Sequence, residues 1–236
     1  MRPVPWTAGD GVKAFVIYWL GFPLLLVLGL YAGAWLWQPL KPIVQLWTDQ
    51  NVVVSFAFNL LIDAAGLMVV WHFVKKRDGH LNDLGWRRFD VFAAIGFVVL
   101  GFILLILTVA GIAFVVQHFF PIYDTAQPQT NEFTSKAAIG TNWALMALVV
   151  MPPIIEETIF RGFLLPALAT KAGFWPATLA VSLVFALAHG QANVGVYTFL
   201  LSIVTCFMYR RFDSIVPGVL LHMLNNLITY WAMLSR

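Results

Sequence analysis

Long apolar runs, separated by short polar stretches, follow one another along the whole chain. A run of about 20 apolar residues can cross a bilayer as a helix, so the pattern predicts a bundle of membrane helices. The fold class expected is all-α, a polytopic membrane bundle of about seven or eight helices around a polar cavity. The predicted spans are residues 13–37, 52–74, 91–116, 137–170, 174–189, 193–209 and 214–234.

The basic residues decide how the segment 137–170 is counted. Positively charged loops favour the cytoplasmic side of a membrane, which assigns loop 75–90 and the pair Arg210-Arg211 to that side. Loop 75–90 and the arginine pair lie on the cytoplasmic side together only if segment 137–170 crosses the membrane once, as a long helix broken near Pro152-Pro153. We therefore expect seven full crossings, with a re-entrant or interfacial segment as an eighth element. The same count leaves Arg236 outside, against the charge rule.

The composition supports the same class of protein. Apolar residues make up 61% of the chain and charged residues 11%, well outside the norm for soluble domains. We expect a single integral-membrane domain over residues 1–236, with the lipid bilayer as a partner. The net charge of +3 is too small and too dispersed for a nucleic-acid-binding protein. Cys206 is the sole cysteine, which excludes an intrachain disulfide.

One apolar stretch, from Pro152 to Gly162, contains three charged side chains at the expected membrane depth. Ionised groups are costly there and are usually paired or functional. Glu157 and Arg161 lie one turn apart on one helix face, in the order that favours an ion pair. Glu156 points about 100° away from Glu157 and is left free for chemistry. The plainer alternative is an ion pair that only holds helices together.

Two later apolar segments contribute further polar side chains. His189 ends the segment 174–189, and His222 and Asn226 share one face of the last segment. A lone histidine in an apolar helix would be explained by packing. Two of them, together with an unpaired glutamate, favour a chemical role.

A different polar pair lies in the predicted span 52–74. Asn59 and Asp63 are one turn apart on one face. Buried polar residues of this kind usually hydrogen-bond across a bundle, so we expect a structural role in preference to a functional one.

The residue types suit hydrolysis of a peptide bond. A glutamate in an apolar site is a workable base for water, and a histidine can hold that water or carry protons. A histidine N–H and an asparagine amide can form an oxyanion hole. Glu156, His189 and His222 could instead bind a divalent metal such as zinc, and the residues alone leave both mechanisms open. No His-Glu-x-x-His or Gly-x-Ser-x-Gly motif is present.

Three motifs, in this order, resemble the signature of the CAAX prenyl protease and bacteriocin-processing family of intramembrane proteases. They are Glu156-Glu157-x-x-x-Arg161, Phe185-x-x-x-His189 and His222-x-x-x-Asn226, and the first continues into Gly162. The segment 83–88 is also similar to a leucine-glycine basic loop found in the family. The resemblance covers the expected catalytic core, residues 137–236.

The resemblance implies an intramembrane endopeptidase built as a bundle of mostly eight helices around a cavity. It implies that Glu156 activates water with help from His189, and that His222 and Asn226 stabilise the oxyanion. Glu157 and Arg161 match motif positions with a supporting role. We favour this mechanism without a cofactor over the metal-dependent one, because the oxyanion role accounts better for Asn226.

The implied substrate is a peptide or membrane-associated protein, of which the prenylated Cys-a-a-X proteins cleaved by eukaryotic relatives are one kind. The compact chain is expected to be a multi-pass protein of a prokaryotic cell membrane. A non-catalytic membrane scaffold or chaperone of the same fold is the main alternative. A proton-coupled transporter with Glu156 as carrier is the third, although internal repeats are lacking.

Overall fold

Every regular element that the computed structural model contains within residues 2–48, 52–119, 145–189 and 192–234, the residues it describes, is helical. The predicted all-α class is therefore confirmed for this part of the chain. The longer helical runs are α1 (Ala8–Val16), η1 (Ile17–Gly21) and α2 (Phe22–Leu36); α3 (Lys41–Thr48); α4 (Val52–Lys75); α5 (Val91–Phe119); η4 (Met146–Val150), α9 (Met151–Glu157), η5 (Thr158–Leu164) and α10 (Leu165–Ala172); α11 (Phe174–Ala188); α12 (Ala192–Phe212); and α13 (Val216–Leu234).

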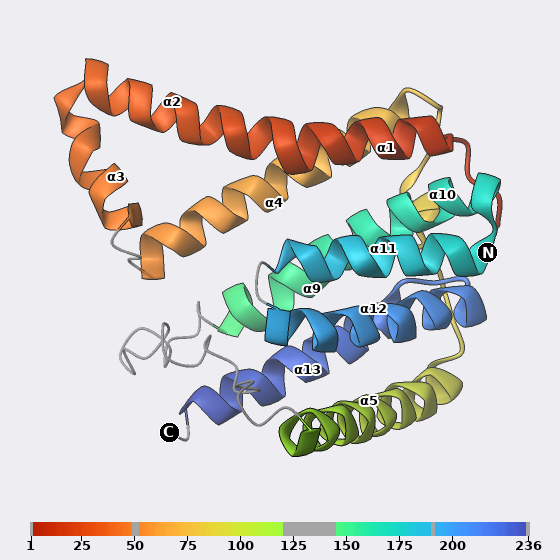
Figure 1. The fold of residues 1–236 in the computed structure, drawn as a ribbon. Coiled ribbons are helices and arrows are strands. Elements are labelled where there is room, and N and C mark those ends of the chain that lie inside the picture. The colour runs from red at the N-terminus through yellow and green to blue at the C-terminus, as the bar shows by residue number, and fades with distance from the viewer. Residues whose placement is uncertain (1, 49–51, 120–144, 190–191, 235–236) are drawn as a thin grey trace.

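The helices from η4 onward form the packed part of the bundle. Helix α11 packs against α10 and α12, and α13 packs against α12, α9 and η4 (Figure 1). Helix α5 covers α12 and α13 at one edge, and α1 covers α10 at the other. Helices α2, α3 and the start of α4 extend away from this core (Figure 1).

Three helices in the described ranges are long and apolar enough to cross a bilayer. They are Ala8–Leu36 with 29 residues, Ala57–Lys75 with 19 and Val91–Phe119 with 29. Large apolar side chains on these helices point outward, for example Leu25 and Leu107 with exposed fractions of 69% and 63%. Exposed apolar surface of this kind is suited to lipid contact. The protein is therefore a membrane protein, and the count of seven or eight spans stays a prediction.

The helical run through Pro152 and Pro153 differs from the expectation. We predicted a break there, but the chain stays helical from Met146 to Ala172. A proline removes one backbone N–H and crowds the carbonyl four residues earlier. The wider π-helical turns of η4 precede the two prolines, and a second π-helical segment, η5, follows Glu157. Local widening of this type takes up a proline without a break and is frequent at functional sites.

Ion pairs draw the basic segments together at one end of the bundle. Arg2 and Arg87 each lie 2.8 Å from Asp213, in the turn between α12 and α13. Arg77, after α4, lies 3.0 Å from Asp10 of α1. The N-terminus, the α4–α5 loop and the α12–α13 turn thus meet at one end (Figure 1). The predicted grouping of these basic segments on one side agrees with the fold, and the cytoplasmic identity of that side stays a prediction.

The loop 81–88 connects η5 to the turn before α13. The Trp86 indole N–H donates to the Thr158 hydroxyl at 3.2 Å, and the Ile215 backbone N–H donates to the Gly85 carbonyl at 3.0 Å. The carbonyl of Leu84 lies so close to Gly162 that a Cβ atom there would overlap it. The glycine is therefore required for this close approach, which fixes the helix carrying Glu156 relative to α13.

Replacing Gly162 by alanine is expected to destabilise the protein by about 1–3 kcal/mol, since the methyl group must displace the Leu84 backbone. Thermal unfolding in detergent measures the effect. The control is Gly96→Ala, because no atom lies within 4 Å of the position its Cβ would take. Equal melting temperatures for the two variants would contradict the proposed contact.

Candidate active site

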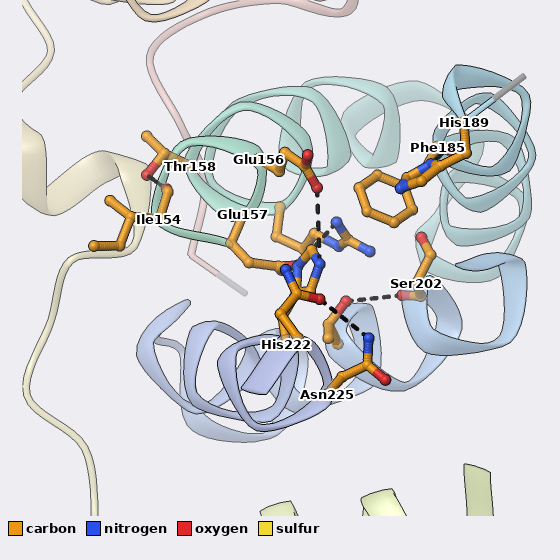
Figure 2. A network of polar contacts seen from close by, with 12 residues as sticks. Ile154, Glu156, Glu157, Thr158, Phe185, His189, Ser202, His222 and Asn225 are labelled. Carbon is orange, nitrogen blue, oxygen red and sulfur yellow. Dashed lines mark hydrogen bonds and ion pairs between the residues drawn. The ribbon is translucent and has the colours of Figure 1, made fainter. Parts of the chain in front are cut away.

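The two adjacent glutamates of α9 lie in different surroundings, as Figure 2 shows. The Glu157 side chain is buried, with an exposed fraction of 1%. The Glu156 side chain keeps 24% of its surface exposed. The helical turn between them separates the carboxylates, as the sequence predicts.

The buried carboxylate of Glu157 is held by two cationic or polar partners. Arg161 Nη1 lies 3.1 Å from Glu157 Oε1, which is the predicted ion pair. His222 Nδ1 of α13 lies 3.2 Å from the same oxygen. A carboxylate only accepts hydrogen bonds here, so His222 donates from Nδ1. Helices α9, η5 and α13 are thereby joined through one carboxylate, and the sequence did not predict the histidine contact.

A glycine in α13 permits this close approach. Gly218 lies one turn before His222, and a Cβ atom on it would lie 3.3 Å from Glu157 Oε2 and 3.2 Å from the Thr205 Cβ. A larger residue would push α13 away from α9. Its position four residues before His222 is a signal in the sequence for this close approach, and the sequence analysis did not include it.

The second ring nitrogen of His222 faces the other glutamate. His222 Nε2 lies 3.9 Å from Glu156 Oε2, which is too long for a hydrogen bond. Glu156 Oε2 has no hydrogen-bond partner among the described residues. The imidazole therefore lies between two carboxylates, bonded to Glu157 and open toward Glu156. This oxygen is buried, and the role of Glu156 as a free catalytic carboxylate stays a prediction.

Edge-to-face contacts with the Phe185 ring join His189 to His222. Its Nδ1 lies 2.8 Å from the Phe185 carbonyl, which can only accept, so Nε2 is left as an acceptor. The Phe185 ring lies 4.9 Å from the His189 ring and 5.9 Å from the His222 ring, between centroids. The Arg161 guanidinium lies 4.4 Å from the Phe185 centroid. Phe185 thus separates the buried Arg161 from His189.

The asparagines of α13 form a chain of hydrogen bonds. Asn226 Nδ2 donates to the Leu148 carbonyl of η4 at 3.0 Å. Asn225 Nδ2 donates to Asn226 Oδ1 at 3.1 Å, and the Tyr197 hydroxyl donates to Asn225 Oδ1. Tyr197 was not predicted, because one tyrosine in an apolar helix carries no distinctive signal. One N–H of the Asn226 amide remains beyond the bond to Leu148.

Two cavities of about 430 Å³ each meet at the glutamate. We call them the N-terminal cavity, between η1, α2, α4, α9 and α11, and the C-terminal cavity, between α5, α12 and α13. Leu148, Glu156 and His189 line both. The C-terminal cavity also contains His222 and Asn226, so the four predicted catalytic residues share its wall.

The alternative metal set of Glu156, His189 and His222 stays a prediction. Within the described residues, no three His, Cys, Asp or Glu side chains converge as ligands of an ion. His222 Nδ1 and His189 Nδ1 are directed at Glu157 and a carbonyl. We derive no step through a metal.

Comparison with known families gives a match over part of the chain. Residues 138–228 match the family described as type II CAAX prenyl endopeptidase Rce1-like. This region is similar to that family. The match contains Glu156, Glu157, Arg161, His189, His222 and Asn226, and it confirms the resemblance that the three motifs carry. The family is one of proteases. No curated protein and no solved structure matches the chain.

Breaking the buried ion pair is expected to cost stability. Arg161→Met should lower the free energy of unfolding by about 3–5 kcal/mol, because Glu157 is left with an uncompensated charge. Adding Glu157→Gln should restore part of that loss. Denaturant unfolding of both single variants and the double variant in detergent measures the coupling. Additive losses in the double variant would show that the two side chains are not coupled.

Proposed function

We propose that the protein is an intramembrane endopeptidase in which Glu156 activates the attacking water. The observation that carries this proposal is the Glu156 side chain, which lines both cavities and faces an imidazole held by Glu157, with no hydrogen bond to its Oε2 among the described residues. The Rce1-like match over residues 138–228 supports protease activity. The multi-pass topology and a prokaryotic cell membrane as its location belong to the same proposal.

The first chemical step is attack by water on the scissile carbonyl carbon. The water oxygen bonds to that carbon while Glu156 takes one proton from the water. The C=O electron pair moves onto the carbonyl oxygen. His189 Nδ1 is bonded to the Phe185 carbonyl. Its Nε2 can therefore accept a hydrogen bond from the water and helps to orient it. No covalent bond to the enzyme forms.

The second step is collapse of the tetrahedral intermediate. The C–N bond breaks, the carbonyl re-forms and the leaving amine takes the proton held by Glu156. Donors aimed at the oxyanion stabilise the transition state that precedes this step. Asn226 supplies its remaining amide N–H, and His222 is the second proposed donor to the oxyanion. Glu157 and Arg161 act as positioning residues.

The expected substrate is a peptide segment of a membrane-associated protein, with a prenylated Cys-a-a-X protein as one candidate. The C-terminal cavity supports an apolar ligand, because Phe102, Ile106 and Leu201 form part of its wall. An extended peptide is the ligand that two cavities joined at Glu156 would accept.

A non-catalytic membrane scaffold is the second candidate. It is favoured by one observation: the Glu157, Arg161 and His222 contacts and the bond from Asn226 to Leu148 all join neighbouring helices. A scaffold would use these side chains for packing alone. It gives no reason for a Glu156 oxygen that lacks a hydrogen bond among the described residues.

Glu156→Gln is expected to abolish cleavage in a library of quenched fluorescent peptides that includes farnesylated Cys-a-a-X peptides. The amide cannot take the proton from water, while its shape is preserved. His80→Ala is the control, because the His80 side chain is 77% exposed. Cleavage that persists in Glu156→Gln would overturn the mechanism. Loss of wild-type cleavage with a chelator, and rescue by added metal, would favour the metal-dependent version.

Asn226→Ala is expected to lower kcat by about 10²–10³-fold, the range seen when one oxyanion donor is removed. Asn225→Ala is the matched comparison, with a smaller loss, since its amide nitrogen is bonded to Asn226. Steady-state kinetics on one cleaved peptide measure both. An equal or larger loss of kcat for Asn225→Ala would contradict the assignment of Asn226 as the oxyanion donor.

A further inference from the structure

The N-terminal cavity contains a carboxylate that the proposed hydrolysis does not use. Asp63 of α4 lines this cavity together with Asn59, one turn earlier on the same helix. Asp63 lies within the apolar candidate span Ala57–Lys75. An ionisable side chain in such a segment is costly and is a functional candidate unless a partner explains it.

A neighbouring helix holds Asp63 in a defined orientation. The Tyr18 hydroxyl of η1 donates to Asp63 Oδ1 at 3.3 Å. The Tyr18 ring fits beside Gly66, where a Cβ atom would approach it to 2.6 Å. A glycine, a tyrosine and an aspartate thus form one arrangement across two helices. The predicted hydrogen bond between helices exists, and it leaves Asp63 Oδ2 unused by Tyr18.

The charges around the N-terminal cavity are of one sign. Asp63 and Glu156 both line it, and none of its described lining residues is a lysine or an arginine. No ion pair to Asp63 is found in the described part of the chain. Among the described residues that line the C-terminal cavity, Glu156 is the sole acidic one. The linings of the two cavities therefore differ in charge, and the extra carboxylate of the N-terminal cavity has no counter-charge in the part of the chain that the structure describes.

We propose that the N-terminal cavity binds a cationic group of the substrate, a lysine or arginine side chain, with Asp63 as the residue that determines this specificity. The apolar stem of such a side chain suits the walls formed by Trp19, Leu60 and Met151, with its charged end at Asp63. That this cation site lies beside the scissile bond rests on the proposed function. That Asp63 binds a cation does not depend on the proposed function.

The physical reason is the state of Asp63 before binding. Its carboxylate is already partly removed from water, so a cation that pairs with it relieves a penalty that exists in the free protein. An uncharged group of the same shape gives no such relief. A purely structural Asp63, satisfied by Tyr18 alone, would not distinguish the two groups.

Binding is measured on the Glu156→Gln protein, in which Asp63 is the remaining acidic residue of the cavity. The probes are two fluorescein-labelled nonapeptides of leucine and alanine, one with a central lysine and the other with that lysine acetylated. Anisotropy in a neutral maltoside detergent gives the two dissociation constants. Asp63→Asn and Asp78→Asn are then added singly, the second as a matched control because Asp78 is exposed at the basic end.

The lysine peptide is expected to bind at least about tenfold more tightly than the acetylated one, as a charge-assisted hydrogen bond allows. Asp63→Asn should remove this difference, since the amide still accepts from Tyr18 but carries no charge, and Asp78→Asn should preserve it. Equal binding of the two peptides to Glu156→Gln would overturn the proposal, even if Asp63→Asn failed to fold. A difference that survives Asp63→Asn would overturn it as well.

Cleavage by the protein with Glu156 intact separates this proposal from the proposed function. Product sequencing of a digested peptide library should reveal lysine or arginine enriched on one side of the cut, and Asp63→Asn should remove the enrichment. Cleavage without enrichment contradicts the role of Asp63 and leaves the protease intact. Charge-selective binding without any cleavage contradicts the protease and supports the cation site.

Discussion

The site depends on one buried carboxylate shared between two partners. Glu157 Oε1 lies 3.1 Å from Arg161 and 3.2 Å from His222, so a single oxygen fixes a cation on its own helix and an imidazole on α13. Both partners offset the cost of burying the charge, and losing either would leave the Glu157 charge less compensated. The bond to Nδ1 also directs Nε2 of His222 toward Glu156. The contact that packs α13 against α9 therefore also orients the imidazole that faces Glu156.

The close contacts around this carboxylate need small residues at defined positions. Gly218 lets α13 approach Glu157, and Gly162 lets the loop at Leu84 press against η5. The loop in turn bonds to the turn before α13 through Gly85. Three segments distant in sequence are therefore held at one place. The π-helical turns on either side of α9 adapt the backbone to this arrangement.

Local periodicity explains what could be predicted. Helical spacing alone indicates that Glu157 reaches Arg161 and that Glu156 points elsewhere, and the apolar runs indicate the all-α class. The contact of His222 with Glu157 joins residues 65 apart and depends on how α13 packs, which no local pattern contains. The same holds for Tyr197 with Asn225. The expected break at Pro152-Pro153 was wrong because π-helical turns accommodate prolines in a way that residue propensities do not reveal.

The two neighbouring glutamates differ in role: Glu157 is held by Arg161 and His222 for packing, and Glu156 is proposed to carry the chemistry. The most direct test measures thermal unfolding and peptide turnover side by side for Glu156→Gln and Glu157→Gln. We predict that Glu156→Gln keeps the wild-type melting temperature and loses turnover, whereas Glu157→Gln unfolds at a lower temperature because Arg161 loses its counter-charge. Similar melting temperatures for both variants, or turnover retained in Glu156→Gln, would contradict the account.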